Sequence, residues 1–270
     1  MKHHKFNILT IISLIFLLTT AFYPTLAFGE KDKGNQDLPE VEGIYDVPGH
    51  PKLKLRVFVY RAKPASSPAP TLQCDLPDPD SSAMDAWAGW KLPFGTSYYL
   101  NSASVPSTVG STNLRKIASS SFDVWNQASG KKFTLNNAGE TSASRAAFDS
   151  KNIIAWGRAP GSALGITYIW YYPSSGRVAE VDTIMNKKFT WYWSDPTSWD
   201  TNTTGNTCAY QGVYDAQDIL THELGHWFGL NDHYTTDYTN NTMYGYGAKT
   251  ETKKDTLTAG DVAGIVAIYQ

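Results

Sequence analysis

The pentapeptide HELGH at positions 222–226 constrains the fold of this 270-residue chain more than any other feature. Apolar residues precede it at helical spacing, so we expect a helix over about residues 215–228. Positions i and i+4 lie on one face of a helix, and His222 and His226 can therefore bind the same ion. Glu223 projects beside them, placed to take a proton from a water molecule that the metal activates. The spacing predicts a helix that carries a catalytic metal.

A third metal ligand is expected shortly after this helix. Gly229 stands where a left-handed turn can end the helix and return the chain toward the metal. Asp232 follows at the spacing HExxHxxGxxD, and zinc accepts two imidazoles and a carboxylate. His233, one residue later, is the competing candidate, whereas Glu251 lies in a Lys/Thr-rich stretch and leaves Gly229 without a role. We assign Asp232.

The arrangement resembles a known family. Met243 lies in a Thr-Met-Tyr-Gly segment downstream, and together with HExxHxxGxxD this resembles the metzincin clan of zinc endopeptidases and, within it, the matrixin-like families. The resemblance covers most of the chain from about Gly89 onward, with weaker support from residues 154–157, 163–168 and 257–269. It implies an α+β fold with a twisted, mostly parallel sheet, an active-site helix, a Met-turn and a C-terminal helix.

The same resemblance implies roles for individual residues. His222 and His226 would be zinc ligands, and Glu223 would be the general base and later the general acid. Met243 would lie beneath the ion as an apolar floor. Residues 163–167 would form an exposed strand edge along which a protein or peptide substrate lies.

Hydrophobic periodicity predicts the other elements. A helix is expected from about Leu114, with Ser111 or Thr112 as its N-cap and Gly130 at its end, and a last helix over 258–269 should begin with a capping box. Alternating and β-branched segments predict strands over residues 53–60, 96–101, 152–156, 165–172, 177–185 and 189–193.

The N-terminal quarter of the chain begins with a segment that predicts export. Residues 1–27 have the basic start, apolar segment and small-residue cleavage site of a signal peptide. Residues 28–73 are expected to form a leader or pro-segment with a Pro-rich linker, and residues 74–270 the catalytic domain. The chain would then be a secreted, extracellular protein, monomeric and without membrane attachment after signal cleavage.

Secretion gives the two cysteines a meaning. In an oxidising compartment Cys74 and Cys208 are expected to form a disulfide. By the family resemblance, Cys74 could instead act as a cysteine switch that caps the zinc, although the Arg and Gly that usually flank such a cysteine are missing.

Composition narrows the partners and cofactors. A net charge of −2 without basic clusters argues against nucleic-acid binding. No histidine lies between Pro51 and Thr221, which argues against the second, structural zinc of the family. Glu180 and Asp182 resemble family calcium regions and raise the option of a structural Ca²⁺. The rival function is a secreted module that holds a metal without turnover.

Overall fold

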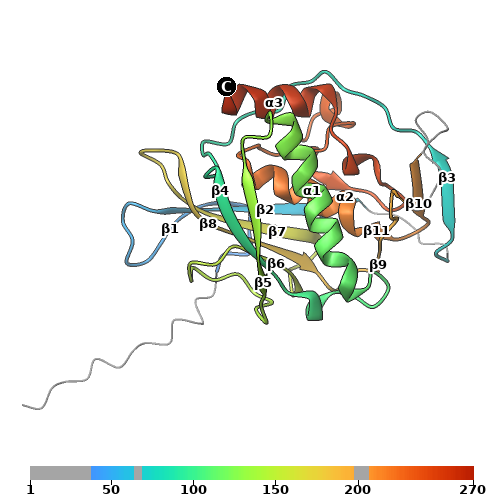
Figure 1. Cartoon of the computed structure of the whole chain (residues 1–270), viewed down its shortest axis with the longest axis horizontal. Coiled ribbons are helices and arrows are strands. Elements are labelled where there is room, and N and C mark those ends of the chain that lie inside the picture. The colour runs from blue at the N-terminus through green and yellow to red at the C-terminus, as the bar shows by residue number, and fades with distance from the viewer. Residues whose placement is uncertain (1–37, 64–68, 198–206) are drawn as a thin grey trace, which may run out of the picture. The chain divides into compact units, whose positions relative to one another are not determined.

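A mixed eight-stranded sheet is the framework of the molecule (Figure 1). Its order is β1 (Gly43–Asp46), β2 (Lys54–Ala62), β7 (Ala163–Tyr172), β8 (Arg177–Asn186), β6 (Ile153–Gly157), β4 (Gly95–Leu100) and β5 (Thr134–Glu140), and β12 (Tyr246–Gly247) also pairs with β2. Only β1 and β7 run against the direction of the other strands in this sheet as described. The expected mostly parallel sheet is confirmed.

The computed structural model describes residues 38–63, 69–197 and 207–270. The predicted signal peptide over residues 1–27 lies outside the described residues. None of the helices in the described part is both long and apolar enough to span a bilayer.

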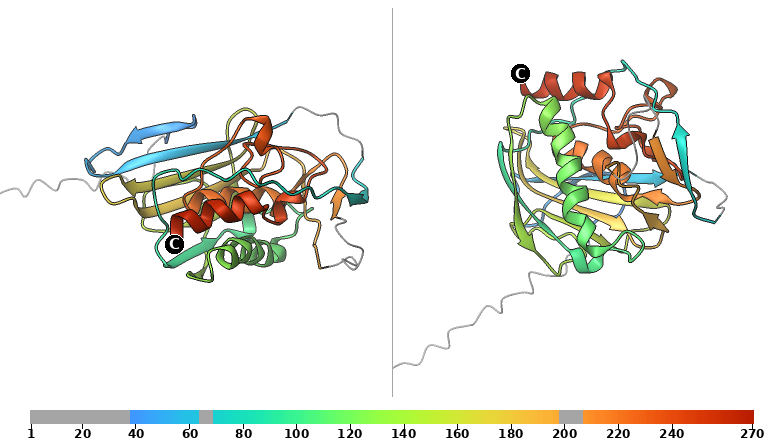
Figure 2. Two further views of the ribbon diagram at one scale, coloured as in Figure 1. Left: turned by 90° about the horizontal axis from the view of Figure 1, so that it is seen from above. Right: turned by 45° about the vertical axis from the view of Figure 1, so that its right-hand side comes forward.

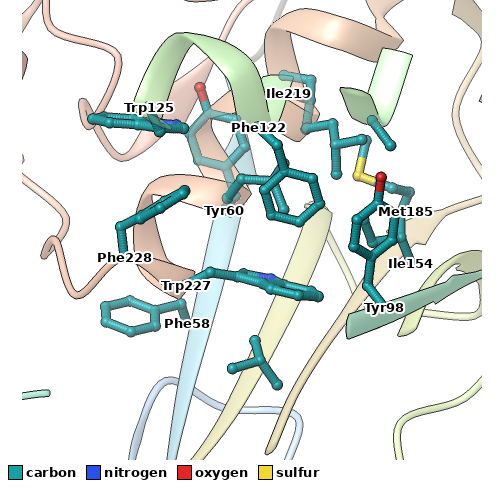
Figure 3. Packing of buried hydrophobic residues seen from close by; sticks show 14 of the residues in the cluster. Phe58, Tyr60, Tyr98, Phe122, Trp125, Ile154, Met185, Ile219, Trp227 and Phe228 are labelled. Atoms are coloured by element: carbon teal, nitrogen blue, oxygen red, sulfur yellow. The ribbon is translucent and has the colours of Figure 1, made fainter. Parts of the chain in front are cut away.

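Three helices pack on one side of the sheet (Figure 2). They are α1 (Leu114–Ala128), α2 (Ala216–Trp227) and α3 (Ala259–Tyr269). Between them and the sheet lies the larger core cluster, in which Trp125 from α1 and Trp227 from α2 lie near Phe58 and Tyr60 of β2 (Figure 3). The three predicted helices are therefore confirmed, and α2 is held between α1 and the sheet.

The opposite face of the sheet carries a second apolar cluster. Leu55, Val57 and Val59 of β2 belong to it, whereas Phe58 and Tyr60 of the same strand belong to the helix-side cluster. Successive side chains of a strand point to opposite faces, so β2 is buried on both. It has the environment of a central strand.

The helix boundaries confirm most of the predicted caps. Thr258 and Asp261 form the expected capping box of α3, and Gly130 has a φ of 79° just after α1. Ser111 and Thr112 are not the N-cap of α1, and that prediction is wrong. They lie in a 3₁₀ turn over Ser111–Asn113, which leads directly into the first turn of the helix.

Cys74 and Cys208 form a disulfide. It joins β3 (Leu72–Leu76) to β10 (Thr207–Tyr210), which pair antiparallel, and a second small sheet pairs β9 (Trp191–Tyr192) with β11 (Tyr214–Asp215). No free thiol remains among the described residues to cap a metal, so the disulfide prediction is confirmed over the cysteine switch.

The leader forms part of the main sheet. Residues 43–62, which we expect outside the catalytic domain, include β1 and β2, and both strands belong to the main sheet. The division of the chain at residue 74 stays a prediction, while the sheet itself includes these two strands.

Candidate active site

Helix α2 is built to hold its side chains in one place. Its N-cap is Asp215, whose carboxylate accepts hydrogen bonds from the backbone of Gln217 (2.8 Å) and Asp218 (3.2 Å). Every residue of the helix is buried. A fully buried helix with a satisfied N-terminus presents its side chains in a single geometry.

The predicted turn after α2 is present. Gly229 has a φ of 98°, and Leu230 donates its N–H to the carbonyl of Gly225 at 3.1 Å. A Cβ atom at position 229 would lie 2.3 Å from the carbonyl oxygen of Trp90, so only glycine fits. The turn returns the chain to the helix face that carries the histidines, and Asp232 arrives there.

His222, His226 and Asp232 converge. The Oδ1 atom of Asp232 lies 3.2 Å from Nε2 of His222 and 3.6 Å from Nε2 of His226. One ligand atom from each of the three residues lies within 4.8 Å of the others, and all three side chains are buried. This is the set of residues that the sequence predicts as metal ligands.

The hydrogen bonds of the two imidazoles leave their Nε2 atoms as acceptors. Nδ1 of His222 lies 2.7 Å from the carbonyl of Thr242, and Nδ1 of His226 lies 2.9 Å from the carbonyl of Leu230. A carbonyl only accepts, so each Nδ1 carries the proton. Burial lowers the pKa of both imidazoles to about 3, which keeps them neutral.

The three converging residues therefore present acceptor atoms that no donor or cation of the protein satisfies. Nε2 of both histidines and Oδ1 of Asp232 have no hydrogen-bond partner, although they are buried. Buried acceptors that face one another without a donor are costly unless a cation lies between them. Two imidazoles and one carboxylate are a donor set that suits Zn²⁺.

Glu223 is held by a chain of hydrogen bonds from the sheet. Trp227 Nε1 donates to Thr183 Oγ1 at 2.9 Å, Thr183 Oγ1 lies 2.7 Å from Thr167 Oγ1, and Thr167 donates to Glu223 Oε2 at 2.5 Å. Because an indole only donates, the hydroxyl of Thr183 is free to donate to Thr167. Every donor in this series of hydrogen bonds therefore points toward the carboxylate of Glu223. Oε1 of Glu223 has no partner, and burial raises the pKa of the side chain to about 8.

The segment around Met243 lies directly against α2. A Cβ atom on Gly225 would lie 2.2 Å from the sulfur of Met243, which is fully buried. The carboxylate of Asp261 accepts the backbone N–H groups of Thr242 (3.0 Å) and Met243 (3.3 Å). The N-terminus of α3 thus fixes the turn whose Thr242 carbonyl orients His222.

The two competing ligand candidates, His233 and Glu251, make contacts away from the cluster of three residues. The ring of His233 stacks on Tyr238 with centroids 3.8 Å apart, and its Nε2 accepts the N–H of Ala86 at 3.1 Å. Glu251 forms ion pairs with Lys254 (3.1 Å) and Lys253 (3.4 Å). Neither side chain belongs to the cluster of three.

The carboxylates considered for calcium bind the backbone instead. Both oxygens of Glu180 accept N–H groups, from Asp149 and Ser150, and both oxygens of Asp182 accept N–H groups, from Ala147 and Ile153. These contacts hold the loop that precedes β6. They give the calcium prediction no support.

Sequence reasoning missed the residues that support the site. In the sequence, Thr167 and Thr183 indicate only β-branched residues of a strand, and nothing in their pattern indicates the contact with Glu223. The hydroxyl of Tyr234 lies 3.2 Å from Asp232 Oδ2 and 3.1 Å from Glu42 Oε2. Its position two residues after the ligand is the only local signal that could have identified it.

The expected open strand edge is occupied. Residues 163–167 of β7 pair antiparallel with β2, with Tyr60 opposite Gly165 and Phe58 opposite Thr167. The prediction that this edge is exposed is wrong in this structure, because a strand from the leader covers it.

Three features together have the arrangement expected of a metzincin metal site: the helix with its two histidines, the carboxylate returned by the glycine turn, and the turn with the buried methionine. A comparison with protein families matches residues 90–270 to the family described as Matrixin. The match covers more than half of the chain, and the chain belongs to the matrixin family, whose members are zinc-dependent endopeptidases. A search of curated proteins finds no match.

Proposed function

We propose that the chain is a secreted zinc endopeptidase in which His222, His226 and Asp232 hold a single catalytic zinc. The observation that carries this proposal is the convergence of three buried acceptor atoms without a protein donor. The family match supports the general activity. Secretion rests on the signal-peptide pattern of residues 1–27.

Glu223 moves the proton in this proposal. When bound, zinc supplies a Lewis acid that polarises the scissile carbonyl and acidifies water. Glu223 takes the proton of the attacking water on Oε1, the oxygen without a protein partner, and returns it to the leaving amine. Thr167 holds Oε2, so the free oxygen keeps a fixed direction.

The proposed substrates are proteins or peptides in extended conformation, outside the cell. The net charge of −2 and the lack of basic clusters in the sequence argue against nucleic acid as a substrate. We propose that the chain holds one zinc, since no histidine is available between residues 51 and 221 for another zinc site of the family type. That it acts as a monomer stays a prediction.

Hydrolysis of casein by the purified protein tests the proposal. We expect cleavage that a chelator abolishes, that zinc restores, and that Glu223→Gln removes while zinc stays bound. Glu140→Gln is the matched control, because this glutamate is exposed and lies on β5. Stoichiometric zinc without cleavage of any protein, in wild type, in the control and also after limited proteolysis has released the β2 segment that covers β7, would contradict the proposal and support a metal-holding binding module.

A further inference from the structure

The main sheet has a gap between β4 and β8. Strand β6 lies between these two strands, but it pairs only with Tyr99 and Leu100 of β4 and with β8 from Asp182 onward. The N-terminal halves of β4 and β8 therefore have no described strand between them. A cavity of about 470 Å³ lies there, lined by residues 95–97 and 99 of β4 and 177–179 of β8. We call this cavity the sheet slot.

Both ends of the sheet slot are closed. At one end the side chain of Asn152 joins the two strands, because its Nδ2 donates to the carbonyl of Ser97 at 2.8 Å and its Oδ1 accepts the N–H of Val181 at 2.7 Å. At the other end Lys91 forms a parallel bridge with Arg177. A polymer cannot run through a slot closed in this way, so it accepts a small molecule or the end of a chain.

Two tyrosine rings line the slot on the face of the sheet that the helices do not cover. Tyr172 follows Tyr171, whose side chain belongs to the helix-side cluster, so Tyr172 points to the opposite face. Tyr99 is half-buried and packs against the apolar cluster of that same face. Tyr172 is 38% exposed, whereas Trp170 and Tyr171 before it are buried. It is therefore the member of this aromatic run that a ligand can reach.

The slot carries positive charge without a negative partner. Arg177 lies opposite Tyr172 in the register of β7 and β8, so the two side chains share one face. Arg177 is exposed, and none of the ion pairs between described residues includes it. The Nζ atom of Lys151 lies 5.8 Å from the centre of the Tyr99 ring. None of the described residues that line the slot is acidic, so the slot favours an anion.

The other polar groups of the slot are mostly hydroxyls. Thr96, Ser97 and Ser150 line it together with the two phenols. A hydroxyl both donates and accepts hydrogen bonds, whereas a phosphate or sulfate ion mainly accepts them. The matching ligand therefore combines an anionic group with hydroxyls of its own, and it has an apolar face for the aromatic rings.

We propose that the sheet slot binds an acidic sugar, namely a uronic acid unit at the end of a glycan chain. Arg177 pairs with the carboxylate of the sugar, Tyr172 and Tyr99 contact its ring, and the hydroxyls of Ser97 and Ser150 bind its hydroxyl groups. The volume of about 470 Å³ lies within the usual range of ligand pockets, about 300–1,000 Å³. The proposal concerns binding alone and does not depend on the endopeptidase function.

Calorimetric titration of the full chain with methyl glucuronide tests the proposal. The methyl ester of this probe keeps the ring and the hydroxyls but loses the charge, and we expect it to bind about tenfold more weakly. Arg177→Gln should weaken the probe to the level of the ester and leave the ester unchanged. Arg115→Gln is the matched control, because it removes an exposed arginine from α1 and should bind the probe as wild type does. Equal affinity of wild type and Arg177→Gln for the probe would overturn the proposal.

A second pair of variants tests whether the probe enters the slot. Ala179 is exposed and lines the slot, so Ala179→Trp fills it, whereas Ala179→Ser leaves its space open. We expect the first variant to bind neither probe nor ester and the second to bind both as wild type does. If Ala179→Trp does not fold, Tyr172→Leu removes an exposed ring and should weaken probe and ester alike. Undiminished binding in the folded variants would contradict the proposal.

The choice of ligand separates the sugar from other anions and from the metal centre. Acetate that competes as strongly as the probe would show a simple anion site and overturn the proposal. A trisaccharide with glucuronate at its non-reducing end should bind, and one with glucuronate only as its central unit should not; equal binding of the two would refute the closed slot. Zinc-loaded and chelator-treated protein should bind the probe equally, since the slot contains none of the three proposed ligands. Loss of binding with the chelator would place the probe on the metal instead.

Discussion

Replacing Thr167 by valine tests whether the strand, and not only the helix, sets the reactivity of Glu223. Valine keeps the shape of threonine and removes one hydroxyl, which donates to Glu223 Oε2 at 2.5 Å. Thr167 touches no substrate in the proposed mechanism and acts through Glu223, so it is a positioning residue. The carboxylate would lose its only side-chain donor among the described residues.

The expected magnitude follows from the kind of hydrogen bond that is lost. A buried hydrogen bond to a charged group contributes about 1.5–3 kcal/mol. The Thr167 hydrogen bond favours the ionised carboxylate, so its loss raises the pKa of Glu223 by about one to two units at 1.36 kcal/mol each. If the same energy is lost in the transition state, kcat/KM falls by about tenfold to a hundredfold.

The pH profile of kcat/KM distinguishes this role from loss of stability. The base must be ionised to accept a proton, so a raised pKa moves the acidic limb to higher pH and makes the loss smaller at alkaline pH. Thr96→Val is the control, because it removes a buried hydroxyl that donates to Pro93, away from the site. The reasoning is refuted if Thr167→Val lowers the melting temperature as Thr96→Val does but leaves the acidic limb in place.

Three further predictions concern other parts of the molecule. Asp232→Ala should abolish zinc retention in dialysed protein, whereas His233→Ala should retain one zinc; the reverse result would reassign the third ligand. Burial raises the pKa of Asp85 from 3.8 to about 10, so the stability that its neutral form contributes is complete below about pH 4 and is lost as the pH rises toward 10. The free energy of urea unfolding should therefore depend less on pH in Asp85→Asn than in wild type. The same pH dependence in both proteins would contradict this prediction. The disulfide closes a sequence separation of 134 residues, so Cys74→Ala/Cys208→Ala should lower the free energy of unfolding by about 4–5 kcal/mol, and an unchanged urea midpoint would contradict this.

The catalytic helix can be predicted from the sequence because its signals are local. The spacing of His222 and His226, the apolar residues before them and the glycine after them all act within about four helical turns. Asp232 follows because a turn at Gly229 leaves few places for the next side chains. The capping box of α3 is predictable for the same reason.

The partner of a strand is not a local property. Alternation identifies β2 as a strand, but its pairing with β7 joins Phe58 to Thr167 across more than a hundred residues. Leader chemistry on both sides of β2 then suggests a separate segment, whereas burial on both faces places it inside the sheet. The support of Glu223 by Thr167 depends on this same tertiary packing and has no pattern of its own.

The carboxylate of Asp261 links the last helix to the centre of the molecule. It starts α3 and at the same time holds the backbone of Thr242 and Met243, and Thr242 in turn orients His222. During synthesis the ribosome adds this residue after every proposed ligand, so a growing chain has its histidines before it has the group that aligns them. The catalytic geometry is thereby a property of the finished polypeptide, and a nascent chain that already contains HExxH is still without an organised protease site.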